Sequence, residues 1–465
     1  MSESPDLQAP PGVVELREDI PLKASVSGYS SARLCVGGPR VILAAFTVLT
    51  VAVTIALLTQ IYYGDYEVVP HGSVSSSAAA CSRAGTAALR AGGRAVDAAA
   101  ASALCLAVLA PHRTSLDASG SLIYWEYRAS RAQLPTIVEW GEETGAGVTT
   151  TPRPPRLLVA LAALHARLGV LPWTQILQPA IDLAREGYPV TASLAAAAEA
   201  RSLIGYTPAA LRTEPALADY LESLKYNTST DLCSNWSCTT AVRWKEGVKP
   251  VLVGPWRIWA GGAGGALAAG ALTSALAVNV TQLTTGSVFQ GVVENLKTLS
   301  LSVGEQWPRG VASGLAVADP LDIYVALVTG LSLPFGSDAG VRSDTAWSRD
   351  EPTAPLDLAP AIITDQHICG TRYIIGAESG VSLAEGAAAA LSDTSGFAAN
   401  AIEGARVAVL AGGTLAAEPG RVVPAFPDLP ALNATVLPAF NFVQQKGDAL
   451  LSHADSRGGG LASRF

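Results

Sequence analysis

The chain has 465 residues, of which 49% are hydrophobic and 15% are charged, against about 25% charged in a typical soluble domain. Its formal charge of −8 and its pI of about 5.3 argue against a polyanionic partner such as nucleic acid. The length allows two or three domains, or one large α/β domain. The six cysteines are too few for a disulfide scaffold but allow two bridges and spare thiols.

The first apolar segment lies near the N-terminus. Residues 1–40 are polar and without periodicity, and we interpret them as a disordered tail. Residues 41–63 carry no charge, and as a helix they would be roughly 34 Å long, enough to cross a hydrocarbon core of about 30 Å. A cleaved signal peptide would start nearer residue 1 and have a shorter apolar core, and a buried helix is the other alternative. We predict a transmembrane helix over 41–63.

Flanking charges predict the orientation of this helix. Lys23, Arg33 and Arg40 precede it, whereas Asp65 and Glu67 follow it. The positive-inside rule then predicts a cytosolic N-terminus and a lumenal or extracellular remainder, that is, a single-pass type II membrane protein.

Four N-glycosylation sequons lie on the predicted outer side, and they begin at Asn227, Asn235, Asn279 and Asn433. An oxidising compartment also makes disulfides the default for the cysteines there. The candidates are Cys81, Cys105, Cys233 and Cys238.

Residues 76–112 hold the most informative pattern. Ser77–Arg90 is predicted as a helix that ends at Gly92-Gly93, and Val96–Leu109 as a second, alanine-rich helix with Asp97 at its start. The stretch also contains Gly-Gly-x-Ala-Val-Asp-Ala-Ala, Leu-Cys-Leu and a closing Pro-His. This combination resembles the gamma-glutamyltransferase family, and most closely its divergent vertebrate types 6 and 7.

The resemblance continues over residues 157–194, with a helix that carries His165, a Gly-x-Leu-Pro-Trp turn and a Pro-Ala-Ile helix. It covers roughly residues 41–390. It implies an αββα sandwich of the N-terminal-nucleophile hydrolase type, an α/β fold, over residues 64–418. Residues 419–465 are expected to form a Pro-rich and polar C-terminal tail. The resemblance further implies a Cys81–Cys105 disulfide, places Cys233 and Cys238 near a second family pair, and implies a long helix over Ala266–Val278.

Two apolar runs follow, Val311–Ala318 and Ile323–Val328, and Asp319-Pro320-Leu321-Asp322 lies between them. Alternating β-branched and small residues around a Pro/Asp turn predict a buried β-hairpin. In active members of the family, this hairpin opens with a Thr that attacks the γ-glutamyl amide after the precursor cleaves itself, and its free amine is the base. Here Val311 occupies that position, so the reactive oxygen is missing.

Ser313 is a candidate substitute for the nucleophile. It would share a face with Val311 but lie about 7 Å further along the strand, and the plainer interpretation is a small packing residue. Other family positions also carry different residues. The substrate-gripping Arg aligns with Gly141, a second Thr with Gly330, the Ser pair with Asp357-Leu358, and the oxyanion glycines with Ser379-Gly380; Asp344 is the nearest candidate for an acidic amino-group binder.

We therefore predict a membrane glycoprotein that keeps the family fold without working catalytic residues. It would act as a scaffold, or by binding an unknown protein partner or a γ-glutamyl ligand such as glutathione. The alternative is an active glutathione hydrolase or gamma-glutamyl transpeptidase with rearranged site residues. A receptor-like or transport-accessory role has no specific support. The glycine run 261–265 lacks the Lys-Ser/Thr of a phosphate loop, and we expect no cofactor and no metal.

Overall fold

The computed structural model describes residues 38–63, 71–128, 133–141, 153–276, 285–339, 346–367, 370–392, 398–432 and 437–465. The chain divides into an N-terminal unit, Met1–Glu67, and a compact unit, Val68–Phe465. Predicted features at Asn279, Asp344 and Asn433 lie outside the described residues.

The described part of the N-terminal unit is one helix, α1 (Gly38–Tyr63). Within the described residues, it is the one helix long and apolar enough to cross a membrane by length and composition. The hydroxyls of its threonines donate to backbone carbonyl oxygens one turn earlier in the same helix: Thr50 to Phe46 O at 2.8 Å and Thr54 to Thr50 O at 2.7 Å. Such internal pairing suits a helix without water around it.

Two antiparallel sheets form the centre of the compact unit. The first has seven strands in the order β17-β1-β9-β10-β2-β3-β6. The second has six strands in the order β16-β15-β12-β11-β8-β7. The first sheet comprises β1 (Ser73–Ser76), β2 (Ser119–Glu126), β3 (Thr136–Trp140), β6 (Val242–Lys245), β9 (Val311–Ala318), β10 (Ile323–Leu331) and β17 (Ser463–Arg464). The second comprises β7 (Val251–Val253), β8 (Trp256–Ala260), β11 (Ala359–Asp365), β12 (Arg372–Ala377), β15 (Phe440–Lys446) and β16 (Ala449–His453).

The two sheets pack on each other through side chains from both inner faces, among them Trp125 and Tyr324 from the first sheet and Trp259 and Ile374 from the second. Two short pairs lie outside them, β4 (Tyr188–Pro189) with β5 (Leu211–Arg212) and β13 (Val407–Val409) with β14 (Leu415–Ala417).

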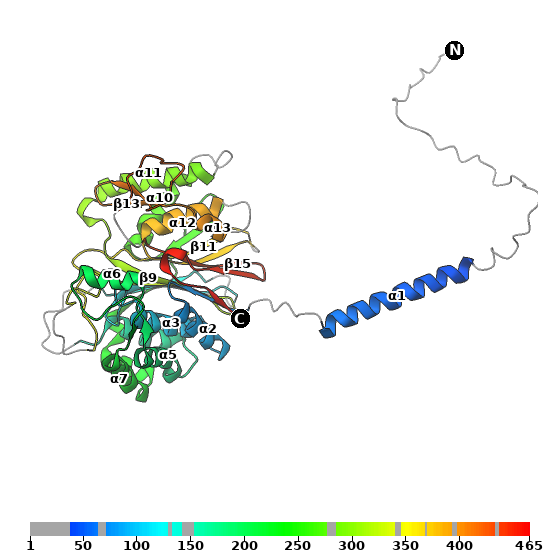
Figure 1. Ribbon diagram of the computed structural model, residues 1–465, viewed down its shortest axis with the longest axis horizontal. Coiled ribbons are helices and arrows are strands. Elements are labelled where there is room, and N and C mark those ends of the chain that lie inside the picture. The colour runs from blue at the N-terminus through cyan, green and yellow to red at the C-terminus, as the bar shows by residue number, and fades with distance from the viewer. Residues whose placement is uncertain are drawn as a thin grey trace, which may run out of the picture. The chain divides into compact units, whose positions relative to one another are not determined.

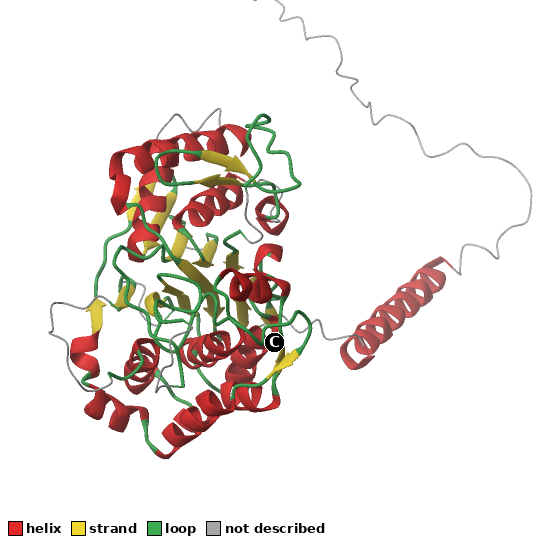
Figure 2. Ribbon diagram, turned by 60° about the vertical axis from the view of Figure 1, so that its left-hand side comes forward, coloured by secondary structure: helices red, strands yellow, loops and turns green. Residues whose placement is uncertain are grey.

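Helices cover both outer faces, which gives the four-layer αββα sandwich of the N-terminal-nucleophile hydrolases (Figures 1 and 2). The first sheet is covered by α2 (Ala79–Arg90), α3 (Ala95–Leu109), α4 (Arg156–Leu168), α5 (Trp173–Glu186), α6 (Ala192–Ala200), α7 (Pro215–Ser223), α8 (Ser229–Trp236) and α9 (Cys238–Ala241). The second is covered by α10 (Gly262–Leu276), α11 (Thr285–Val303), α12 (Gly380–Ser392) and α13 (Ala398–Ile402). This confirms the predicted fold class.

The α2–α3 pair forms as predicted because small residues let the helices approach closely. A Cβ on Gly85 would lie 2.3 Å from Ser102 Oγ, so only glycine fits there. The Cys81–Cys105 disulfide joins the two helices, with its Cα atoms 5.3 Å apart. The carboxylate of Asp97 is fully buried and accepts the Arg94 N–H at 2.8 Å, which caps α3.

The predicted hairpin is confirmed as β9 and β10, at the centre of the first sheet. Val311 pairs with Leu331 at one end and Ala318 with Tyr324 at the other, so β10 runs past the predicted end at Val328. Asp319 fixes the turn, since its carboxylate accepts the N–H groups of Leu321 and Ile323, each at 2.9 Å.

The expectation of a C-terminal tail over residues 419–465 is corrected by the structure. Strand β15 pairs with β12 inside the second sheet, and β17 pairs with β1 in the first. The hydrophobic pattern does not predict strand β15, because its buried residues include the polar Asn441, Gln444 and Gln445. They find hydrogen-bond partners only in the folded protein; Asn441, for example, donates to Gly314 O at 3.0 Å.

Candidate active site

The segment 356–358 contributes to two cavities, a smaller cavity and a larger cleft. The smaller cavity, of about 340 Å³, opens at the start of β9. Asp357 faces it, while its neighbours Leu356 and Leu358 line the larger cleft. The smaller cavity is lined by His112, Arg113, Ser193, Ala196, Ala197, Ala200, Gly310, Val311, Ala312, Pro334, Asp357, Glu378, Ser379, Leu437 and Pro438.

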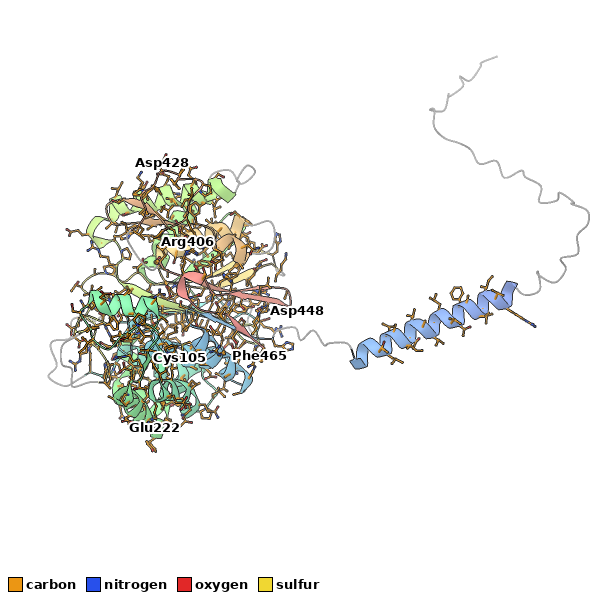
Figure 3. The ribbon with its side chains drawn as sticks, in the orientation of Figure 1. Cys105, Glu222, Arg406, Asp428, Asp448 and Phe465 are labelled. Atoms are coloured by element: carbon orange, nitrogen blue, oxygen red, sulfur yellow. A yellow bond between two sulfur atoms is a disulfide. The ribbon has the colours of Figure 1, made fainter. Side chains whose placement is uncertain are left out.

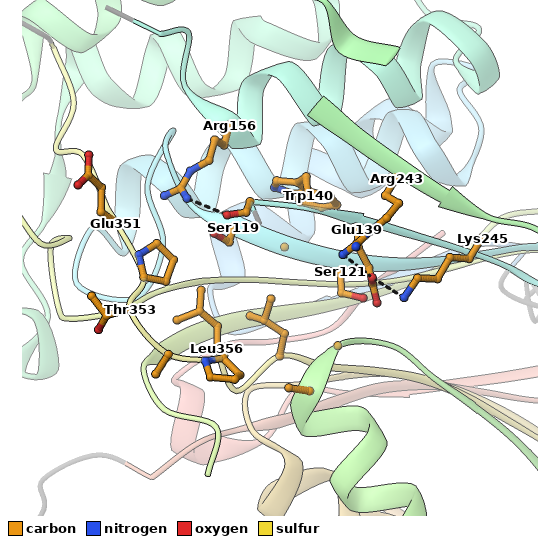
Figure 4. Close-up of a pocket in the computed structure, with 18 residues that line it drawn as sticks. Ser119, Ser121, Glu139, Trp140, Arg156, Arg243, Lys245, Glu351, Thr353 and Leu356 are labelled. Atoms are coloured by element: carbon orange, nitrogen blue, oxygen red, sulfur yellow. Dashed lines mark hydrogen bonds and ion pairs between the residues drawn. The ribbon is translucent and has the colours of Figure 1, made fainter. Parts of the chain in front are cut away.

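The larger cleft, of about 960 Å³, lies along the ends of β2 and β3 (Figure 4). Glu139 sits between two cations there and pairs with Lys245 at 2.6 Å and Arg243 at 3.4 Å. Arg156 donates to the backbone oxygens of Asp117 at 2.8 Å and Gly141 at 3.2 Å, and it pairs with the Asp117 carboxylate at 3.3 Å. The hydroxyls of Ser119 and Ser121 are buried and have no hydrogen-bond partner among the described residues.

The position expected for the nucleophile lies on the smaller cavity. Val311 begins β9 and lines this cavity, so an aliphatic side chain stands where an attacking hydroxyl would be needed. Ser313 lies elsewhere: it pairs with Thr329 across the hairpin and is only 2% exposed. It is not among the residues that line the cavity, and its hydroxyl has no partner in the part of the chain that the structure describes.

The positions expected for the substrate Arg and the second Thr have no room for a side chain. Gly141 lines the larger cleft with φ of +103°, and a Cβ there would lie 2.1 Å from Ser119 Oγ. A Cβ on Gly330 would lie 2.7 Å from the Val311 carbonyl oxygen and 2.9 Å from the Leu358 side chain. The backbone around both positions is therefore built for glycine.

The expected oxyanion position lies at the start of α12. Ser379 and Ser382 hold this end by reciprocal bonds, each backbone N–H donating to the other hydroxyl at 3.1 and 3.0 Å. The Gly380 N–H donates to Asp357 Oδ1 at 2.7 Å. Burial raises the pKa of Asp357 to about 7, against the opposing effect of this hydrogen bond. No cation lies within ion-pairing distance of Asp357 among the described residues.

The wall of the smaller cavity also carries a buried ion pair. Arg113 Nη1 lies 2.7 Å from Glu378 Oε2, and both side chains are almost fully buried. Glu378 also accepts the Ala439 N–H at 2.9 Å. Beside this pair, both ring nitrogens of His112 lack a hydrogen-bond partner among the described residues. Burial and the charge of Arg113 lower the pKa of His112 to about 3, so its ring is neutral.

Sequence reasoning did not identify His112 or the Arg113–Glu378 pair. The two charged residues are separated by 265 positions in the sequence, so no local pattern signals their contact. Pro111-His112 closes the motif that carries the family resemblance, but nothing in that motif points to Arg113 or to its distant partner.

One further constellation has the residue types of a hydrolytic triad. His165 Nδ1 lies 2.8 Å from Ser229 Oγ, and its Nε2 lies 3.5 Å from Asp97 Oδ1. All three residues are buried, and Ser229 lines none of the cavities described here. Trp173 packs on the imidazole at 5.1 Å. The cluster joins α3, α4 and α8, and because its members are buried it offers no access for a substrate.

The remaining predicted residues lie on α8 and beside it. Asn235 is exposed and Asn227 is half-buried. A Cys233–Cys238 disulfide encloses Asn235, with its Cα atoms 4.9 Å apart. Across the described residues, no group of three or more His, Cys, Asp or Glu side chains could hold a metal ion.

Comparisons with known proteins agree with this architecture. A family model described as gamma-glutamyltranspeptidase matches residues 81–226. Glutathione hydrolase 7 of Bos taurus is 33% identical over 197 residues, which cover 39% of this chain and 28% of that protein. Glutathione hydrolase 6 of Bos taurus is 38% identical over 143 residues, 30% of this chain and 27% of that protein. The chain thus spans less than a third of the length of these two relatives.

Among solved structures, the cephalosporin acylase from Bacillus halodurans matches with a TM-score of 0.67 and 17% identity, over 85% of this chain and 96% of that chain. At this identity the match shows the fold alone.

Proposed function

Because the chain belongs to the gamma-glutamyltranspeptidase family, as a relative of the type 6 and type 7 glutathione hydrolases, we propose that it is a binding member of that family that does not hydrolyse γ-glutamyl amides. The observation that carries the proposal is the hydrogen bond from the Gly380 N–H to Asp357. In the family, this donor would stabilise the oxyanion of the transition state. Here a carboxylate occupies it and would repel a second negative charge.

Two further observations support the proposal. Val311 offers no oxygen for attack, and losing a nucleophile typically removes several orders of magnitude in rate. The position of the missing Arg, Gly141, faces the larger cleft, whereas Val311 faces the smaller cavity. Leu356 and Leu358 line the larger cleft between them. Gly141 and Val311 therefore do not line the same cavity, whereas a γ-glutamyl substrate would have to contact both positions.

The expected outcome is an uncut, inactive chain. The full-length protein, run reduced on a gel, should give one band, and it should not hydrolyse a γ-glutamyl anilide that an active family member cleaves in parallel. A Val311→Thr variant should behave in the same way, because Asp357 and Gly141 remain. Self-cleavage with a new N-terminus at residue 311 would favour the alternative, an active glutathione hydrolase. Activity that disappears in Ser313→Ala would assign the nucleophile to that residue.

We also propose that the protein is a single-pass type II membrane glycoprotein, with residues 1–40 cytosolic, residues 41–63 in the bilayer and the remainder outside. The support is the apolar helix α1, the charges that flank it, and the exposed Asn235. Glycosidase treatment should increase gel mobility, and Asn235→Gln should remove part of that shift. A tag on residue 1 that is digested from outside intact cells would contradict this orientation.

A further inference from the structure

The smaller cavity has an unusual charge balance. Arg113 and Glu378 neutralise each other at 2.7 Å. The ring of His112 is neutral. The carboxylate of Asp357 is therefore the uncompensated charge among the described residues that line the cavity. Its Oδ1 accepts the Gly380 N–H at 2.7 Å, and its other oxygen makes no hydrogen bond to the described residues.

The rest of the lining is suited to a short aliphatic body. Val311, Ala196, Ala197 and Pro334 line the cavity together with the carboxylate. Its volume of about 340 Å³ is at the low end of ordinary ligand pockets, which run from about 300 to 1,000 Å³. An anionic ligand would meet Asp357 without a free cation to grip it, since Arg113, the cation among the described lining residues, is already paired with Glu378.

From this arrangement we propose that the smaller cavity binds a small primary amine, whose ammonium group pairs with Asp357 while a short aliphatic chain packs against Val311 and the alanines of α6. The inference rests on the proposed function, since it takes the cavity as a binding site and not as a catalytic one. It goes beyond that function by naming the ligand class, which is a cationic amine that need not itself carry a carboxylate group.

Two local features define what the ligand meets at the cavity wall. The Gly380 N–H, at the first residue of α12, fixes the carboxylate through Oδ1. A Cβ on Gly264 of α10 would lie 2.2 Å from that same oxygen, so both helices close on one side of Asp357. The ammonium group therefore approaches from the cavity side. Charge-assisted N–H···O bonds of this kind are about twice as strong as neutral ones.

Binding should depend on pH through Asp357. The titratable groups that face the cavity are His112, Arg113, Glu378 and Asp357. His112, with a pKa of about 3, stays neutral from pH 6 to pH 8, whereas Asp357, with a pKa of about 7, ionises over this range. The ionised fraction of Asp357 rises about tenfold from pH 6 to pH 8, and affinity for an amine should rise with it.

The test is titration calorimetry of the full-length protein in detergent with n-butylamine, with n-butanol and butyrate as neutral and anionic probes of the same length. We expect saturable binding of n-butylamine alone, stronger at pH 8 than at pH 6. Asp357→Asn keeps the acceptor for Gly380 and should weaken binding about tenfold or more. Asp448→Asn, the same change at an exposed residue, should leave it unchanged.

A second variant guards against an indirect effect of the charge change. Ala196→Leu adds a side chain at the cavity edge without touching Asp357 and should also weaken binding. Preferential binding of butyrate, equal binding of all three probes, or an unchanged affinity in Asp357→Asn would each overturn the inference. An uncut and inactive chain that does not bind n-butylamine would contradict this inference but agree with the proposed function. A chain that hydrolyses γ-glutamyl amides and also binds n-butylamine would contradict the proposed function but agree with amine binding in this cavity.

Discussion

At the scale of single residues, the altered positions support one another. Gly141 and Gly330 have no room for the side chains that the family pattern places there, because Ser119, Leu358 and the Val311 carbonyl oxygen occupy the space. A substitution at residue 311 alone would therefore leave positions 141 and 330 without the side chains that the family pattern has there. These positions form one packed arrangement, so we expect that a single substitution at residue 311 does not restore the family pattern.

Comparing two alanine substitutions tests this packing. Gly141 and Gly247 both have positive φ, but a Cβ on Gly247 meets nothing within 4 Å, whereas one on Gly141 would lie 2.1 Å from Ser119 Oγ. Gly247→Ala should cost roughly 1 kcal/mol of stability, from backbone strain alone. Gly141→Ala should cost more, roughly 2–4 kcal/mol, because strain and steric overlap add. Urea unfolding measures both; equal losses would show that Ser119 can move aside.

The raised pKa of Asp357 gives a pH-dependent prediction. Because its folded pKa of about 7 lies above the usual value near 3.9, the stability from its protonated form is complete below about pH 4 and is lost as the pH rises through 7. Asp357→Asn should therefore melt at the wild-type temperature at pH 4 and above it at pH 8, in buffer free of amines. A difference that is the same at both pH values would contradict the assigned burial effect.

At the scale of elements, the buried carboxylate of Asp97 joins two parts of the chain. It caps α3 through the Arg94 N–H and also accepts the Val170 N–H, at 3.1 Å, from the turn after α4. His165, on α4, lies 3.5 Å from it. A residue that would be an ordinary helix-start charge in isolation thus fixes how α3 and α4 pack.

Asp97→Ala should therefore destabilise the protein by roughly 2–4 kcal/mol, because two partly buried N–H groups lose their fully buried acceptor. Asp97→Asn, which keeps one acceptor oxygen, should lose less. The matched control is Asp231→Ala, since Asp231 holds the same position in the capping box of α8 but is exposed. Urea midpoints of the oxidised protein measure all three. A loss for Asp97→Ala no larger than that of the control would show that the buried bonds are dispensable.

Locally encoded elements are those that the sequence predicts well. The helices α2 and α3 and the β9–β10 hairpin have their caps, turn residues and apolar periodicity within a few positions of each other. Strand β15 does not, since its buried amides need distant partners: Gln445 reaches Asp322 at 2.7 Å and Tyr324 at 2.8 Å. Such a strand looks polar until the sheets have formed.

The candidate site divides in the same way. Short motifs are enough to match Val311, Gly141 and Ser379-Gly380 to the positions of the family's site residues. They do not reveal that Asp357 takes the Gly380 N–H, or that residues 356–358 contribute to two separate cavities. These features depend on contacts between β-strands and helix ends that are far apart in sequence.

At the scale of the whole molecule, residues 440–465 contribute strands to both sheets. Phe465, which is labelled in Figure 3, accepts the His71 N–H through its backbone oxygen at 2.7 Å, two residues before β1. In the second sheet, Asp455 is fully buried and pairs with Arg406 at 2.7 Å, and it also accepts the Phe440 N–H at 2.9 Å. Arg457 extends this network to Glu418 at 2.7 Å.

We expect this network to make residues 440–465 necessary for a stable fold. Asp455→Ala leaves the buried guanidinium of Arg406 without its partner and frees the start of β15, so it should cost roughly 3–5 kcal/mol. Asp448→Ala, in the exposed turn between β15 and β16, should change stability little. Urea unfolding and trypsin digestion measure the two variants side by side. If Asp455→Ala unfolded at the same urea concentration as Asp448→Ala, the hydrogen bonds and ion pairs of Asp455 would not be needed for the stability of the second sheet. Our expectation about residues 440–465 would then be wrong.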